Sequence, residues 1–252
     1  MSTPTALRLT ALHARYQVTE TLRVPVAVIG TVLFPALSLL FFVVPQPFAA
    51  EPEAATSAVA QFAVFAVTSV CLFTYGVGVA EDRSLPWDPF LRTLPAGPGP
   101  RLGGRMLTGL AFALLGLVPL LVLAALLTAA TLPPARVLPS VLALCVAALP
   151  MLCLGLAIGY ALSSKAALAV AQLLLLPLAF AGGLFLPPQM FPAWLDAISQ
   201  WLPTRAGRDL LVTATTGADL PATAVPVLLG WLLLTGVLAV WAYRRDEGRR
   251  FR

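Results

Sequence analysis

Long apolar runs alternate with short polar segments along the whole chain. A helix needs about 20 mostly apolar residues to cross the roughly 30 Å hydrocarbon core of a bilayer. Runs of that length, free of Asp, Glu, Lys and Arg, are Val24–Val44, Ser57–Ala80, Met106–Ala130, Val137–Tyr160, Ala167–Leu186 and Ala222–Tyr243. The pattern predicts an all-α polytopic membrane protein with six transmembrane helices in one domain, residues 24–243.

Composition supports this fold class and excludes others. Apolar residues make up 59% of the 252 residues and charged residues only 11%, and the mean hydropathy is +0.90. A soluble domain carries about 25% charged residues, because its whole surface meets water. A disordered chain, a disulfide scaffold and a cytosolic enzyme are therefore excluded. Cys71, Cys145 and Cys153 lie inside apolar runs and are predicted to be buried hydrophobes.

The positions of the cations predict the topology. With the N-terminus inside, 13 of the 16 Lys and Arg residues fall in cytoplasmic segments, and only Arg136, Arg205 and Arg208 fall outside. Cytoplasmic loops carry the excess of Lys and Arg in membrane proteins, so both termini are predicted to be cytoplasmic. A cleavable signal peptide is the alternative for the first run, which however exceeds the 7–15 residues of a signal core.

Both terminal segments are basic. Residues 1–23 place Leu9, Leu12 and Tyr16 on one side, which predicts an interfacial (elbow) helix, with a solvated basic tail as the alternative. Residues 244–252 form a basic tail that is predicted to fix the topology and to anchor the chain to anionic lipid.

The longest predicted cytoplasmic connection runs from Glu81 to Arg105. It opens on charged residues and continues with large apolar residues at helical spacing, which a plain connection does not need. The pattern predicts docking onto another protein or the membrane surface. The candidate contact residues are Glu81, Asp82, Arg83, Trp87, Phe90, Leu91 and Leu94.

The longest predicted outer connection spans the 35 residues from Pro187 to Pro221. Apolar residues recur at helical spacing from Trp194 to Leu202, which predicts a short amphipathic helix, and Thr204–Thr216 predicts a second one. A membrane-interface anchor explains the tryptophans but not the length. The candidate gate or lid residues are Gly182, Gly183, Phe185, Pro187, Phe191, Trp194 and Trp201.

The spans contain few polar side chains. Candidates for the transport pathway, or more simply for hydrogen bonds between helices, are Thr68, Ser69 and Gln172. Small residues four apart, Gly155, Gly159 and Ser163, predict a close approach of two helices.

Several kinds of chemistry are missing from the sequence. The sole histidine, His13, lies in the leader, so no serine–histidine pair can form within the spans. No His, Cys, Asp or Glu cluster has metal-ligand spacing, no span holds an ionisable residue for proton coupling, and no G-x-x-x-x-G-K-[ST] phosphate loop is present. The chain is therefore predicted to be no enzyme, to bind no metal or cofactor, and to draw its energy from another polypeptide.

Three stretches resemble the type-2 ABC transporter permeases, six-span exporters whose ATPase is often a separate subunit. Residues 23–35 look like the family's R-N-P … F-P opening, and Leu91–Pro95 looks like its L-L-x-T-P element. Residues 182–203 are similar to its S-G-x-x-F-P … L-P-x-W-L … N-P-L segment. The family's E-x-G-T element is replaced here by residues 84–87.

The resemblance implies an ATP-driven exporter. Two permeases, identical or homologous, would sit on two copies of a cytosolic ABC ATPase that binds ATP and magnesium. A coupling helix within residues 81–95 would dock on the ATPase, and residues 187–216 would form a re-entrant lid at the exit. The uncharged spans suit a hydrophobic or amphipathic cargo, such as a drug, an antibiotic or a lipid-like compound. The low-lysine composition looks like that of high-GC bacteria, which implies the bacterial plasma (inner) membrane. No nucleic-acid partner is expected, because the charges lie in short blocks between long apolar runs, as in the loops of a membrane protein.

Two other functions stay open. A non-transporting membrane scaffold or immunity protein would use the same surfaces only for binding. A sodium-driven carrier, with sodium held by backbone carbonyls, is the third hypothesis.

Overall fold

The computed structural model describes the backbone of residues 25–85 and 98–250, and the side chains within residues 33–85 and 102–247. Every regular element in this part of the chain is helical. The elements are α2 (Pro25–Phe42), η1 (Pro47–Ala50), α3 (Pro52–Leu72), η2 (Phe73–Val77), α4 (Gly78–Asp82), α6 (Pro98–Leu115), α7 (Val118–Leu127), α8 (Pro134–Ala161), α9 (Ser164–Ala181), η3 (Pro188–Met190), α10 (Ala193–Ser199), α11 (Pro203–Thr216) and α12 (Ala224–Arg250).

Five helical stretches are long and apolar enough to cross a membrane. They are Pro52–Asp82, Leu102–Leu127, Pro134–Ala161, Ser164–Ala181 and Ala224–Glu247, and a shorter apolar stretch, Leu33–Phe42, belongs to α2. These findings confirm an all-helical, multi-pass membrane protein in the described part of the chain. The predicted elbow helix of residues 1–23, and Trp87, Phe90, Leu91 and Leu94 of the predicted coupling helix, lie outside the described residues.

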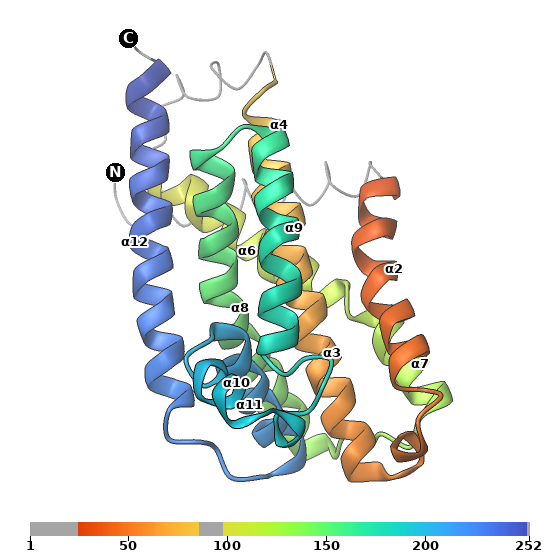
Figure 1. Cartoon of the computed structure of the whole chain (residues 1–252). Coiled ribbons are helices and arrows are strands. Elements are labelled where there is room, and N and C mark those ends of the chain that lie inside the picture. Colours follow the sequence, from red (N-terminus) through yellow and green to blue (C-terminus); the bar gives the residue numbers. More distant parts are fainter. Residues whose placement is uncertain (1–24, 86–97, 251–252) are drawn as a thin grey trace.

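The long helices pack side by side and alternate in direction, so that two ends of the bundle can be distinguished (Figure 1). The α4 end holds α4 and the last turns of α8 and α12, whereas the α11 end holds η1, α10 and α11. The central helix is α3, whose most apolar window is 83% buried, compared with 22% for α9 and 28% for α12. The outer faces of α9 and α12 are therefore left for lipid or another chain.

A close contact between α3 and α8 fixes the centre of the bundle. The span formed by α3 and α4 contains one π-helical turn, η2, and Gly155 of α8 lies against it. A Cβ atom on Gly155 would collide with the carbonyl oxygen of Cys71, and one on Gly159 would lie 2.7 Å from the oxygen of Gly76. The predicted close approach is confirmed for these two glycines. Ser163 lies beyond the end of α8, which is at Ala161, and is the N-cap of α9.

Two predicted spans differ from the observed helices. The run to Leu186 was predicted as one span, but α9 ends at Ala181 because the following glycines turn the chain, with Gly183 at φ 73°. The run from Met106 is divided into α6 and α7, and Pro119 lies in the first turn of α7, where its missing N–H costs least.

Helices also extend beyond some predicted bounds. The Gly- and Pro-rich lead into the third span is helical from Pro98. The predicted basic tail continues α12 as far as Arg250. Charged residues therefore enter the end turns of helices whose centres are apolar, which fits a helix that crosses the headgroup region.

Candidate functional site

At the α4 end, Arg83 joins three helices. The residue follows α4, and its Nη2 forms an ion pair with Asp246 Oδ1 on α12. Its Nη1 donates hydrogen bonds to the carbonyl oxygens of Gly159 and Leu162, at the end of α8. The last carbonyls of a helix lack partners within the helix and favour a nearby cation. Arg83 therefore caps α8 while it holds α12 in place.

A second ion pair extends this network to α6. Arg105 Nη2 lies 3.0 Å from Asp82 Oδ2. The guanidinium carbons of Arg83 and Arg105 lie 5.9 and 6.0 Å from the ring centre of Tyr160, within the range of cation–π attraction. Tyr160 in turn packs edge-on against Tyr243 of α12, with ring centres 5.0 Å apart. We call Asp82, Arg83, Arg105, Tyr160, Tyr243 and Asp246 the α4-end network.

The network changes how the predicted coupling residues are interpreted. Glu81 is exposed and free to meet a partner, whereas Asp82 and Arg83 are engaged with α6 and α12. That all three contact another protein stays a prediction. The sequence analysis missed Asp246, because the tail holds two neighbouring acids, Asp246 and Glu247, among its arginines, and the sequence does not show which of them forms an ion pair.

At the α11 end, the turn after α9 folds back into the bundle. Phe185 packs against four other rings, with centre distances of 4.8 to 5.4 Å; these are Phe42, Phe62, Phe65 and Phe180. Gly182 lies so close to Thr204 of α11 that a Cβ would collide with its hydroxyl. Of the predicted gate residues, Gly182, Gly183 and Phe185 therefore lie together inside the bundle.

The other predicted gate residues lie further out. Pro187 and Phe191 are half-buried, and Trp194 and Trp201 are 66% and 69% exposed. The predicted amphipathic helix is shorter than expected, because α10 ends at Ser199 and Leu202 is extended, as the residue before a proline tends to be. Exposed tryptophans are typical of the membrane interface.

We predict that Phe185→Ala lowers the free energy of unfolding by about 2 kcal/mol, because a partly buried ring and its aromatic contacts are lost. In thermal unfolding of the purified protein, the Tm should fall by roughly 4–8 °C for a chain of this size. Phe41→Ala is the matched control, because Phe41 is 69% exposed. Equal shifts for the two variants would contradict the packing role of Phe185.

Helix α11 is buried between α3, α8 and α12, and it carries a cluster of charges. Arg205 donates from Nε to Asp209 Oδ2 at 2.8 Å and from Nη1 to Asp196 Oδ1 at 3.0 Å. Arg208 donates from Nη1 to Asp209 Oδ1 at 2.7 Å. The hydrogen bond from Arg205, and a further one from Gln200, lower the pKa of Asp196 below its ordinary value. The sequence analysis assigned these charges to the outer side but did not predict their burial.

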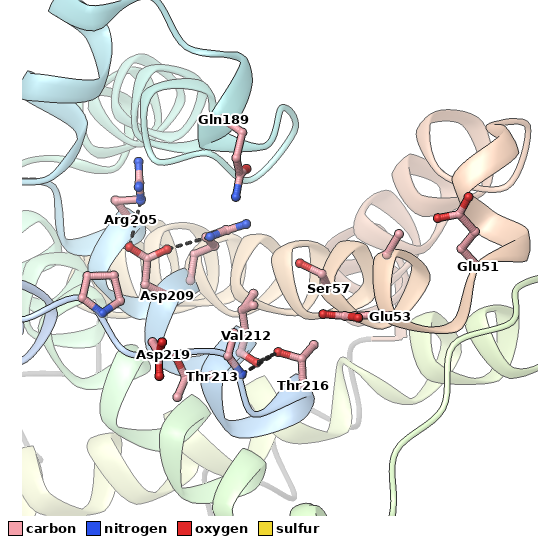
Figure 2. Close-up of a pocket in the computed structure, with 14 residues that line it drawn as sticks. Glu51, Glu53, Ser57, Gln189, Arg205, Asp209, Val212, Thr213, Thr216 and Asp219 are labelled. Atoms are coloured by element: carbon pink, nitrogen blue, oxygen red, sulfur yellow. Dashed lines mark hydrogen bonds and ion pairs between the residues drawn. The ribbon is translucent and has the colours of Figure 1, made fainter.

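A pocket of about 510 Å³ lies beside this cluster (Figure 2). It is lined by Glu51, Glu53, Ala54, Ser57, Gln189, Arg205, Arg208, Asp209, Val212, Thr213, Thr216, Ala218, Asp219 and Pro221. Ten of these fourteen lining residues are polar or charged.

The predicted pathway residues have different environments. Thr68 and Ser69 are buried in the interior of α3, and Ser69 Oγ donates to the carbonyl oxygen of Phe65 at 2.9 Å. Their position favours the role of contacts within the bundle. Gln172 is exposed on α9. Among the described residues, no group of three His, Cys, Asp or Glu side chains is placed to hold a metal ion.

Together, the apolar helices and the charged clusters at both ends define a multi-pass helical membrane protein. Residues 10–215 match the family described as "ABC-2 type transporter", and the chain belongs to this family. It is also similar to "Putative transport permease YvfS" of Bacillus subtilis (strain 168), with 25% identity over 184 residues that cover 73% of this chain and 75% of that protein. The resemblance seen in the sequence motifs is thereby confirmed, and the chain is a permease component of a membrane transporter.

Proposed function

We propose that the chain is the membrane subunit of an ATP-driven exporter, powered by a separate cytosolic ABC ATPase. The observation that carries this proposal is membership of the ABC-2 type transporter family in a sequence without a phosphate-binding loop. The catalytic step, with its ATP and magnesium, then belongs to the partner, and the permease contributes the passage. Two ATPase copies and two permease copies would form the complete transporter.

The proposed topology has six spans, with α2 as the first. Helix α2 is 18 residues long and contains no charged residue. The α4 end carries Arg83, Arg105, Arg244 and Arg245, which supports a cytoplasmic location for this end, because positive loops stay inside. The α11 end would then face the outside of a bacterial plasma membrane.

The exposed face of helix α9 supports the proposal of a second permease copy. Its exposed face carries Leu168, Leu176 and Phe180, and the amide of Gln172 lies four residues from two of them. A side-chain amide facing lipid would lack hydrogen-bond partners, which costs free energy. A second copy packed on this face, or a passage between the copies, would satisfy the amide. The uncharged spans suit a hydrophobic or amphipathic cargo.

The coupling loop provides the test. We predict that Trp87→Ala or Phe90→Ala reduces cargo-stimulated ATP hydrolysis about 30-fold, because truncating an aromatic anchor at an interface costs about 2 kcal/mol. The measurement uses the permease–ATPase complex in proteoliposomes, with the amount of inserted permease checked by immunoblot. Phe41→Ala is the matched control, because Phe41 is an exposed aromatic residue of α2 that belongs to none of the candidate sites.

Other outcomes would replace the proposal. Export that continues after deletion of the ATPase gene and follows an imposed sodium gradient would indicate a sodium-driven carrier. A complex that binds the ATPase but shows no cargo-stimulated hydrolysis and no export would indicate a scaffold or immunity protein.

A further inference from the structure

The pocket at the α11 end contains an arginine whose hydrogen-bonding groups are not all used. Arg208 lies on α11, and its side chain is only 8% exposed. It donates from Nη1 to Asp209, and its Nε is buried without a hydrogen-bond partner in the described part of the chain. Buried polar groups in folded proteins are nearly always hydrogen-bonded. The Nε–H of Arg208 therefore lacks an acceptor, and the side chain that carries it lines a pocket.

Neighbouring charges do not supply that acceptor. Asp209 already accepts hydrogen bonds from both Arg205 and Arg208. Arg205 is occupied further by Asp196 and by the hydroxyl of Ser199. Arg205 is thus committed within the protein, and Arg208 is the cation left to bind an anionic group from outside.

The opposite side of the pocket is acidic. Glu51 and Glu53, at the start of α3, lie across from Arg205 and Asp209, and Asp219 lies in the segment after α11 (Figure 2). All three acids are exposed, and no metal-binding group of side chains includes them in the described residues. An acidic rim repels a simple anion and attracts an ammonium group, so the two sides of the pocket select opposite charges.

We propose that this pocket binds a small zwitterionic group, with its phosphate or carboxylate on Arg208 and its ammonium towards Glu51 and Glu53. A volume of about 510 Å³ lies within the 300–1,000 Å³ typical of small-molecule sites. Planar guanidinium groups bind phosphate and carboxylate through paired hydrogen bonds. The same chemistry occurs in a soluble molecule and in a lipid headgroup. Binding at this site is independent of whether the transporter exports.

The test uses the full chain in nanodiscs of phosphatidylglycerol, a lipid without an amine. Isothermal titration with O-phosphoethanolamine should give saturable binding, and inorganic phosphate should bind at least about tenfold more weakly because it lacks the ammonium. Addition of phosphatidylethanolamine to the nanodiscs separates the sources. If this lipid competes with O-phosphoethanolamine, the site binds a lipid headgroup. If it does not compete, the site binds a soluble ligand.

Variants on each side of the pocket make the test decisive. Arg208→Gln should weaken binding of O-phosphoethanolamine about tenfold or more, and Arg205 remains to pair with Asp209. The double variant Glu51→Gln and Glu53→Gln, at two exposed positions, should weaken binding of O-phosphoethanolamine but not of inorganic phosphate. Arg244→Gln, exposed at the α4 end, is the matched control and should change neither.

Three results would overturn the proposal. They are the absence of saturable binding to the unaltered protein, equal affinity for phosphate and O-phosphoethanolamine, and an unchanged affinity in the double acidic variant. The last result decides the matter even if Arg208→Gln does not fold.

Discussion

Replacing Gly155 by alanine is expected to abolish the accumulation of folded protein. Alanine is favoured over glycine in a helix by about 1 kcal/mol, so the change would stabilise α8 if space were available. The new Cβ would instead collide with the carbonyl oxygen of Cys71 and lie 3.4 Å from the backbone nitrogen of Gly76. Backbone atoms cannot move aside as the end of a flexible side chain can. We expect a net loss of about 3 kcal/mol in the free energy of unfolding, at the upper end of the usual cost of overpacking.

Fluorescence-detected size exclusion of the solubilised protein measures this effect as the loss of the monodisperse peak. Gly230→Ala is the matched control, because a Cβ there meets nothing within 4 Å. The control should leave the protein unchanged or raise its stability slightly, through the helix preference alone. A normal peak for Gly155→Ala, with the same Tm as the Gly230→Ala variant, would show that the two helices are not packed as closely as described.

Asp246→Asn is expected to lower the free energy of unfolding by about 3 kcal/mol and to impair transport. The side chains of Arg83 and Asp246 are 13% and 5% exposed, and removal of one partner from a buried ion pair costs about 3–5 kcal/mol. The cost is expected at the lower end of this range because Arg83 keeps its hydrogen bonds to Gly159 and Leu162. Asp246→Glu, which retains the charge, should restore part of the loss.

Asp82→Asn is the matched control at the same end of the bundle. The side chain of Asp82 is 47% exposed, and exposed ion pairs contribute at most about 1 kcal/mol. Chemical denaturation of the unaltered protein, Asp246→Asn, Arg83→Met and the variant with both changes closes a double-mutant cycle for the ion pair. Asp82→Asn is measured beside them. If Asp246→Asn lowers the free energy of unfolding no more than Asp82→Asn does, the ion pair between Arg83 and Asp246 does not hold α12 to α8.

Hydropathy was sufficient to predict the helical class and the approximate spans, because a bilayer requires long apolar helices. It also located the contact at Gly155 and Gly159, since small residues four apart share one side of a helix. The helical region between α9 and α12 was predicted for a similar reason, from apolar residues at helical spacing.

The remainder depends on contacts between residues that are distant in the sequence. Arg83 and Asp246 are 163 positions apart, and neither is distinguished locally from the other charges of its segment. In the sequence, Phe185 lies at the end of an apolar run and was therefore predicted as part of a span. The turn at Gly183 instead places its ring against other phenylalanine rings of the bundle. Arg208 was counted as a cation of an outer loop, because periodicity does not reveal that α11 is enclosed by three helices.

The position of Tyr160 has a mechanical consequence. Arg83 and Arg105 stand on either side of the connection between α4 and α6, and both contact this one ring on α8. Both ends of the connection are therefore attached to α8 through Tyr160, in addition to the ion pairs of Arg83 with Asp246 and of Arg105 with Asp82. A force applied to the connection would therefore be passed to α8 through the ring of Tyr160. Because α8 also bears on α11 and α12, a push at one end of the bundle can tilt these helices together.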